Sequence, residues 1–146
     1  MKQKLGLLGD DIEDEKLIIE LLSWMHQNKA DYTNTFCYLM GEYKKKNEIY
    51  NETKFILWEK KWENRIKLNN NSKENSLKIM SKVNPLIIPR NHLVEESLQY
   101  ATEKNDLSKV NELLKILQNQ YEKDSVTSIY QSAPLIEENY VTYCGT

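Results

Sequence analysis

The sequence predicts an all-α protein of about five to six helices, followed by an irregular carboxy-terminal tail. Glycine and proline, which interrupt helices, occur only four and three times in 146 residues. Apolar residues recur mostly three and four positions apart, which is the spacing of a helix with one buried face. The hydrophobic share of 40% and the charged share of 29% are typical of an ordinary folded domain with its own core.

The first half of the sequence predicts three helices. The first covers about residues 14–27, where acidic residues near the start suit the helix dipole. A second begins at Asp31, a favourable N-cap residue, and ends at Gly41. After a polar connector at 44–51, a third helix covers about residues 53–68. The positions that we expect to be buried in the first and third helices are Leu17, Ile18, Leu21, Leu22, Met25, Phe55, Trp58, Trp62 and Ile66.

The second half predicts three more helices, separated by a rigid bridge. A short helix at about residues 73–83 follows an exposed asparagine-rich loop at 69–72. It stops at Asn84, because the following Pro85 disfavours helix in the residue before it. Residues 86–89 then form an extended apolar bridge that ends in a second proline.

The last two predicted helices each begin at a polar cap. Asn91 caps a helix that runs to about Glu103, and Asp106 caps the next one. Periodicity fades near Tyr121, so we expect a helical domain at 1–124 and a surface tail at 125–146. The apolar positions expected to face inward in these helices are Val94, Leu98, Ala101, Leu107, Val110, Leu113, Leu114 and Leu117.

Charge and composition exclude several classes of protein. The net charge is −2, and lysine and glutamate alternate along the chain, which argues against a nucleic-acid-binding face. No apolar run approaches the roughly 20 residues of a membrane span. The amino terminus lacks the pattern of a secretory signal. Two cysteines are too few for a disulfide scaffold, so we expect a cytoplasmic protein without a membrane or nucleic-acid partner.

Most residues that could carry chemistry have a simpler structural interpretation. The glycines are not spaced as a phosphate-binding loop, and His26 and His92 lack neighbouring zinc ligands. The acidic run at 10–15 could hold a cation, but a solvated helix start is favoured. The tryptophans could line a ligand pocket, yet core packing is favoured for Trp24, Trp58 and Trp62. No catalytic, metal or cofactor residue is therefore predicted in this chain.

Cys144 is the exception, because it is the third residue from the end of the chain. Chain ends are accessible, and thiol–disulfide exchange requires access. A thiol in this position is suited to a reversible disulfide with another part of a protein. Cys144 is the predicted redox residue.

Five segments occur in an order that closely resembles the carboxy-terminal region of the selenoprotein O family, called YdiU in bacteria. The resemblance covers essentially the whole chain, although Cys37 stands where family members usually carry arginine and 44–51 has no counterpart. The segments are Lys4-Leu-Gly-Leu7, Asp31-Tyr-Thr-Asn-Thr-Phe36, Trp58-x-x-x-Trp62-x-x-Arg65, Asn84-Pro85-x-x-x-x-Arg90-Asn91, and Cys144.

The resemblance implies a kinase-like protein that uses ATP and a divalent metal, Mg²⁺ or Mn²⁺, to transfer AMP to protein hydroxyl groups. The nucleotide-binding residues of that reaction lie upstream of the matched region, so none is carried onto this chain. We therefore expect the back part of a longer protein, whose partner is a kinase-like core on the same or an adjacent polypeptide. The family role carried to Cys144 is a disulfide with that core.

The motif residues themselves predict helix docking in preference to substrate contact. Asp31 and Thr35 lie one helical turn apart and can fasten a helix start, while Asn91 caps another. Arg90 offers a five-donor fork for a carboxylate or for backbone carbonyls. Arg65 shares a helical face with Trp58 and Trp62, where a guanidinium can stack on an indole.

Three functional hypotheses follow, of which a small helical enzyme in its own right is the least favoured, because no nucleophile, base or metal set converges. In the first, the chain is the helical carboxy-terminal region of an AMP-transferring enzyme, inactive alone, and supplies a scaffold with a redox-responsive tail. In the second, it is a freestanding helical interaction module without catalytic activity. In either case, an apolar face that lacks its partner would favour self-association.

Overall fold

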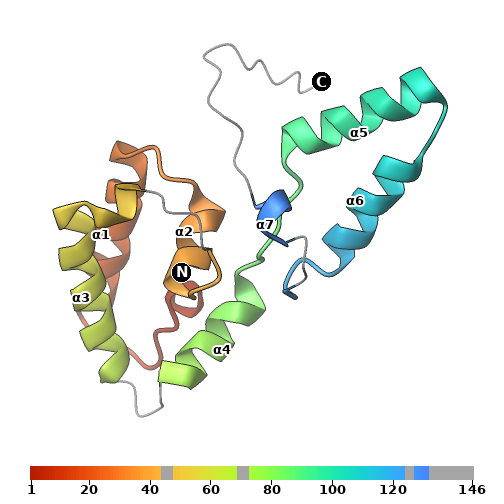
Figure 1. Ribbon diagram of the computed structural model, residues 1–146. Helices are drawn as coiled ribbons and strands as arrows, with labels where there is room; N and C mark the ends of the chain where they lie inside the picture. Colours follow the sequence, from red (N-terminus) through yellow and green to blue (C-terminus); the bar gives the residue numbers. More distant parts are fainter. Residues whose placement is uncertain (44–47, 69–72, 124–126, 132–146) are drawn as a thin grey trace.

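The computed structural model describes residues 1–43, 48–68, 73–123 and 127–131 of the chain, and the helices predicted from the sequence are present (Figure 1). Every regular element among these residues is a helix, which confirms the all-α prediction. The short 3-10 helices are η1 (Lys2–Leu5) and η2 (Glu48–Asn51), and the α-helices are α1 (Asp14–Gln27), α2 (Tyr32–Leu39), α3 (Thr53–Lys67), α4 (Lys73–Val83), α5 (Asn91–Lys104), α6 (Ser108–Gln118) and α7 (Thr127–Tyr130).

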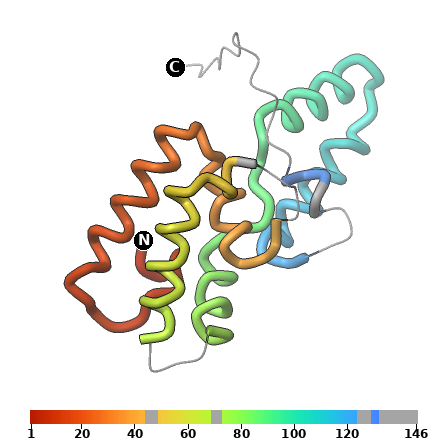
Figure 2. The backbone as a smooth tube through the Cα atoms, turned by 60° about the vertical axis from the view of Figure 1, so that its left-hand side comes forward, coloured from red at the N-terminus to blue at the C-terminus, as the bar shows by residue number. Residues whose placement is uncertain are grey.

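The first four helices surround an aromatic core. Helices α1 and α3 lie side by side, and α4 packs against η1 and the end of α3 (Figures 1 and 2). The predicted packing of the three tryptophans is confirmed, since each is at most 5% exposed. The Trp58 and Trp62 rings stack in parallel with centroids 6.2 Å apart, and Trp24 meets Phe55 at 4.4 Å. Aromatic pairs at these separations stabilise a core beyond their buried area.

Leu22 and the predicted connector are placed differently from the prediction. Leu22 lies at the edge of the buried stripe of α1 and is 37% exposed. Within the described part of the connector, residues 48–51 form η2, and Tyr50 is buried against Tyr38 with ring centroids 4.1 Å apart. Tyr50 belongs to none of the predicted apolar stripes, yet its burial brings this segment into the core.

Helices α5 and α6 pack against each other as a hairpin that stands apart from the first four helices (Figure 1). Leu113 and Ser97 are buried in the hairpin. The inward placement predicted for Leu98, Leu107 and Leu114 is wrong, because these side chains are 53–60% exposed. Within the described residues, α5 and α6 each cover part of the other's apolar stripe, and these leucines lie on the part that faces solvent.

The N-cap predicted at Asp31 is confirmed, since its carboxylate accepts a hydrogen bond from the Asn34 N–H at 2.8 Å. The cap predicted at Asp106 is one residue too early, because the N-cap residue is Leu107, although Asp106 Oδ1 accepts from the Ser108 N–H at 2.8 Å. The cap predicted for Asn91 is wrong, because Asn91 is already helical and the N-cap residue is Arg90, in extended backbone conformation. The proline before Arg90 favours that extended approach.

A second, smaller apolar cluster joins the hairpin to the rest of the molecule. Cys37 from α2 and Leu86 and Ile87 from the bridge are its buried members. The partly buried residues packed against them are Met40, Tyr43, Ile116, Leu117 and Tyr130. The N–H groups of Leu86 and Ile87 both donate to the carbonyl of Gln120, just after α6. The extended bridge therefore contacts both groups of helices.

The predicted tail begins with a short helix. Residues 127–130 form α7, and Gln131 is only 3% exposed. The remainder of the predicted tail, with Cys144, lies outside the described residues.

Gly6 supports a prediction about close packing at the end of η1. Its φ of 64° lies in the left-handed region, and an added Cβ would lie 2.9 Å from both Cβ and the carbonyl oxygen of Ser76. Gly9 has a similar φ of 71° but no heavy atom within 4 Å of an added Cβ. We expect Gly6→Ala to lower the free energy of unfolding by about 2 kcal/mol or more, and Gly9→Ala by about 1 kcal/mol, measured by urea denaturation. Equal losses would show that the contact with Ser76 is unimportant.

Candidate functional site

The start of α2 is fastened by the first motif, Asp31 and Thr35. The Asp31 side chain caps the helix, and the Thr35 hydroxyl donates to the Asp31 carbonyl at 2.8 Å. The same hydroxyl lies 3.2 Å from the Tyr50 hydroxyl, which ties α2 to η2. Thr35 is fully buried, and its hydroxyl finds both of these partners inside the protein.

Arg90, from the other side of the sequence, binds this helix start. Its guanidinium donates from both terminal nitrogens to the two carboxylate oxygens of Asp31, at 2.5 and 3.0 Å. The side chains are 9% and 23% exposed, respectively, so this charge pair is largely buried. Such two-point pairing is both strong and directional. It brings together two motifs that lie 59 residues apart in the sequence.

Asn34 and Gln131 complete this arrangement. Asn34, 2% exposed, accepts from Arg90 Nη2 at 3.3 Å and donates from Nδ2 to the carbonyl of Gln131 at 3.0 Å. The Gln131 side chain donates to the carbonyl of Glu42 at 3.3 Å. We call the set Asp31, Asn34, Arg90 and Gln131 the Arg90 junction. Sequence reasoning missed Asn34 and Gln131, since a buried amide has no periodic signature.

Cys37 lies next to the Arg90 junction, where its thiol is unreactive at neutral pH. It is 0% exposed, and its sulfur lies 3.6 Å from the Pro85 carbonyl oxygen. Burial, together with the nearby Asp31 carboxylate, raises the pKa of the Cys37 thiol to about 12. The nucleophile in thiol chemistry is the thiolate, so Cys37 is a packing residue at neutral pH.

The tryptophan motif and Arg65 hold the amino-terminal segment. The indole N–H of Trp62 donates to the Leu5 carbonyl, and that of Trp58 to the Leu17 carbonyl, each at 2.8 Å. Arg65 donates to Asp14 Oδ1 at 2.7 Å, and to the Leu8 carbonyl at 3.0 Å. The motif thus anchors three successive segments of the first 17 residues.

Asp14 departs from the solvated helix start that the sequence favours for residues 10–15. Its side chain is 1% exposed and forms ion pairs with Arg65 and Lys2. Burial alone would raise the pKa of Asp14, but the hydrogen bonds from Arg65 and Lys2 outweigh it and hold the pKa below its usual value. The sequence does not reveal this role, because Asp14 is the one buried carboxylate in an acidic run whose other carboxylates are not buried.

Asn84 and Pro85 form another fastening point. The Asn84 side chain donates to the Lys4 carbonyl at 2.8 Å, and the Lys4 ammonium donates back to Asn84 Oδ1 at 3.3 Å. This reciprocal pair connects η1 with the end of α4. Asn91 begins α5, while Cys144 lies outside the described residues.

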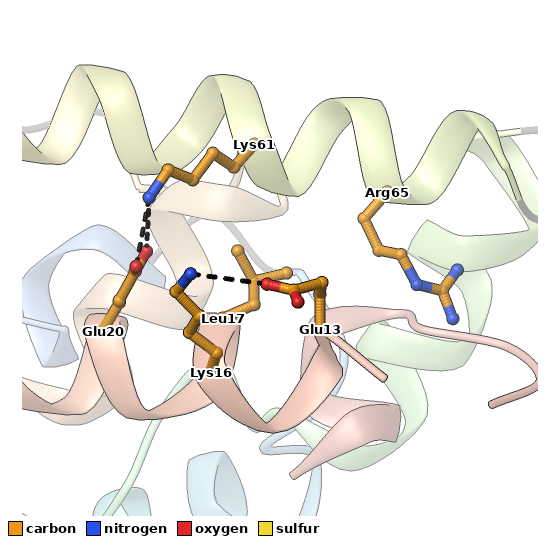
Figure 3. A pocket seen from close by; sticks show the side chains of 6 residues that line it. All are labelled: Glu13, Lys16, Leu17, Glu20, Lys61 and Arg65. Carbon is orange, nitrogen blue, oxygen red and sulfur yellow. Dashed lines mark hydrogen bonds and ion pairs between the residues drawn. The ribbon is translucent and has the colours of Figure 1, made fainter. Parts of the chain in front are cut away.

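A charged surface pocket of about 240 Å³ lies between α1 and α3 (Figure 3). Its lining residues are Glu13, Lys16, Leu17, Glu20, Lys61 and Arg65. Lys61 donates to Glu20 at 2.8 Å, Lys16 pairs with Glu13 at 3.5 Å, and Arg65 pairs with Asp14. A phosphate would have to compete with a carboxylate for each of these cations.

The described part of the chain contains neither a metal-binding cluster nor a membrane-spanning helix. No group of three or more His, Cys, Asp or Glu side chains there is placed to hold a metal ion. Likewise, no helix among the described residues has the length and apolar character needed to cross a membrane.

Comparison with known proteins supports the resemblance seen in the motifs. Residues 1–118 match the family described as Protein adenylyltransferase SelO. The chain is 46% identical to Protein nucleotidyltransferase YdiU of Pelagibacter ubique, 42% to that of Alcanivorax borkumensis and 40% to that of Clostridium botulinum. Each alignment covers 100% of this chain but 30% of the relative, so the chain spans less than a third of the relatives' length.

The Arg90–Asp31 pair supports a stability prediction. We expect Arg90→Met to lower the free energy of unfolding by about 3 kcal/mol, because a largely buried carboxylate and the Asn34 amide lose their partner. The matched control is Lys61→Met, which breaks the exposed pair with Glu20 and should cost less than about 1 kcal/mol. Denaturant titration of both variants measures the difference. Losses of the same size would contradict the proposed contribution of the Arg90 junction to stability.

Asp14 supports a prediction about pH. Because its folded-state pKa lies below the unfolded value near 3.8, the pair stabilises the fold above about pH 4 and loses this effect as the pH falls through the folded pKa. We expect Asp14→Asn to be less stable than the wild type at pH 6 and to lose less stability between pH 5 and 2. Asp10→Asn, at a carboxylate 98% exposed, is the control. If Asp14→Asn lost as much stability as the wild type between pH 5 and 2, this role of Asp14 would be refuted.

Proposed function

Because this chain belongs to the SelO/YdiU protein nucleotidyltransferase family, we propose that it supplies the helical carboxy-terminal region of a kinase-like enzyme that transfers AMP from ATP to protein hydroxyl groups. The observation that carries the proposal is the match of the whole chain to 30% of each relative. In this proposal, ATP and Mg²⁺ or Mn²⁺ bind to the kinase-like core that corresponds to the remaining length.

The contacts of the two motif arginines, and of Lys61 beside them, support a scaffolding role. Arg90 is engaged by Asp31, Arg65 by Asp14, and Lys61 by Glu20. Guanidinium and ammonium groups that grip triphosphate in nucleotide sites must be available to it. The same contacts join segments 41–59 residues apart in the sequence, as expected for side chains that hold helices in place.

The partner in this proposal is the kinase-like core, in the cytoplasm. The exposed leucines of the α5–α6 hairpin, Leu98, Leu107 and Leu114, offer an apolar surface for such a partner or for self-association. The same surface favours the second candidate function, a freestanding interaction module. AMP transfer by the chimera described next distinguishes the two, since the isolated chain is inactive in both.

The enzymatic prediction concerns a chimera. We expect the isolated chain, incubated with ATP, Mg²⁺ or Mn²⁺ and an acceptor protein, to transfer no AMP. A chimera in which this chain replaces the matching region of the Pelagibacter ubique relative should transfer AMP at a rate within about tenfold of that relative, since the two share 46% identity over the whole of this chain. Radiolabelled ATP measures both. Transfer by the isolated chain, or an inactive but folded chimera, would count against the proposal.

The redox prediction concerns Cys144. In the proposal, Cys144 and a thiol of the core form a disulfide by exchange with a disulfide oxidant such as oxidised glutathione. The two thiols lose two electrons and two protons, and the oxidant is released as two thiols. In the chimera, we expect Cys144→Ser to abolish any change in AMP transfer on oxidation, while Cys37→Ser retains it because Cys37 is buried. Redox sensitivity that persists in Cys144→Ser would exclude the tail as the switch.

A further inference from the structure

A groove with an apolar floor lies between α1 and α3. It has a volume of about 390 Å³ and adjoins the charged pocket of Figure 3, with which it shares Glu20 and Lys61. Ile19 from α1 and Leu57 from α3 line the groove, and each is 54% exposed. Trp58 also lines it and is only 4% exposed. Exposed apolar side chains beside a hollow between two helices form a seat for an apolar group of a partner.

The charges around this groove are mostly basic. Its charged lining residues are Lys54, Lys61 and Glu20. Lys61 already pairs with Glu20 at 2.8 Å, whereas Lys54 has no ion pair or hydrogen bond within the described residues. A partner that brings carboxylates together with its apolar group would therefore match the groove electrostatically.

The turn before α1 has this complementary character. Ile12 is 94% exposed, more than any other large hydrophobic side chain among the described residues. It lies between Asp11 and Glu13, with Asp10 one residue further away. The side chains of Asp10 and Glu13 are 98% and 68% exposed. Burial of so exposed an aliphatic side chain is favourable, so Ile12 with its acidic neighbours matches the groove in polarity and in charge.

The spacing along α1 allows two copies of the chain to make this contact reciprocally. Ile12 and the groove residue Ser23 lie 11 positions apart (23 − 12), which is roughly 16 Å along a helix. When the α1 helices of two copies lie antiparallel and cross midway, at residues 17–18, each Ile12 comes level with the groove of the other copy. A twofold pair of this kind uses the same surface on both copies and closes on itself.

We propose that this chain forms a twofold dimer in which Ile12 of each copy occupies the α1–α3 groove of the other. The occupant is a second copy because this chain itself supplies both features that the groove requires, an exposed aliphatic side chain and adjacent carboxylates. The inference does not depend on the proposed enzymatic function, since it concerns two copies of this chain alone.

The direction of α3 brings the acidic neighbours of Ile12 to the basic rim. Because α3 runs antiparallel to α1, Lys54 lies level with the end of α1 and Lys61 with its middle. In the twofold pair, Asp10 of one copy then comes level with Lys54 of the other, and Glu13 with Lys61. The pair of Asp10 with Lys2 is largely exposed, so its exchange for Lys54 costs little.

Sedimentation equilibrium of the full chain measures the dimer. At about 0.2 mM we expect an average mass approaching twice that of one 17.3 kDa chain, and no larger species. We expect Ile12→Asp to raise the dissociation constant roughly tenfold or more, since both groove contacts lose their apolar group. Its far-UV circular dichroism should match that of the wild type, because Ile12 is exposed in the single chain. A monomeric wild type, or growth beyond a dimer, would overturn the proposal.

The matched control is Leu98→Asp, which places the same charge on a leucine of the α5–α6 hairpin that is 55% exposed. We expect its dissociation constant to stay within about twofold of the wild-type value, because the hairpin lies outside the proposed contact. If Leu98→Asp weakened the dimer as much as Ile12→Asp or more, the hairpin would be the contact surface and the proposal would be wrong.

A charge swap tests the alignment of the two copies. Lys54→Glu and Asp10→Lys each place like charges opposite one another, so each should weaken the dimer roughly three- to tenfold. The double variant restores opposite charges and should return the dissociation constant to within about threefold of the wild-type value. A double variant in which the two losses simply add would show that Asp10 does not meet Lys54, and would overturn the twofold arrangement.

Discussion

The largely buried charge pair between Arg90 and Asp31 is the contact on which the arrangement of the two helical groups depends. The α5–α6 hairpin makes few direct contacts with the first four helices and is connected to them through residues 84–90, which contain the bridge at 86–89. Arg90 directly follows that bridge, and Asp31 is the N-cap residue of α2. A buried pair costs desolvation energy, which is recovered only when the remaining donors and acceptors are satisfied. The helix cap supplies a partner for Asp31 and Asn34 supplies one for Arg90 Nη2, whereas Arg90 Nε is buried without a hydrogen-bond partner among the described residues.

The other motif residues repeat this pattern on a smaller scale. Trp62 and Arg65 hold the amino-terminal segment from α3, and Asn84 holds Lys4 from the end of α4. Each contact uses a directional polar group to fix where an apolar surface docks. Hydrophobic burial stabilises the core without specifying a unique arrangement, and these hydrogen bonds select one. The motifs that lie within the described residues thus fix how the helices dock against one another.

The helices of this protein were predictable from its sequence, whereas the long-range contacts were not. The period of α1 and the cap at Asp31 are local signals, and both predicted helix starts agree with the structure. Burial of Asp14, Tyr50 and Gln131 depends on segments far away in the chain, for which one sequence has no signal. The predicted burial of Leu98 and Leu114 was wrong for a related reason: periodicity identifies an apolar face without showing whether a neighbour covers it.

The most direct test of the account is a double-mutant cycle between Asp31→Asn and Arg90→Met, measured by urea denaturation. The cycle removes the effects that each substitution has on its other neighbours and leaves the interaction between the two side chains. The account predicts a coupling free energy of about 2 kcal/mol or more, together with weakened protection of Gln131 in both single variants. A coupling near zero, with additive losses, would mean that the two helical groups are held together by the apolar cluster around Leu86 instead.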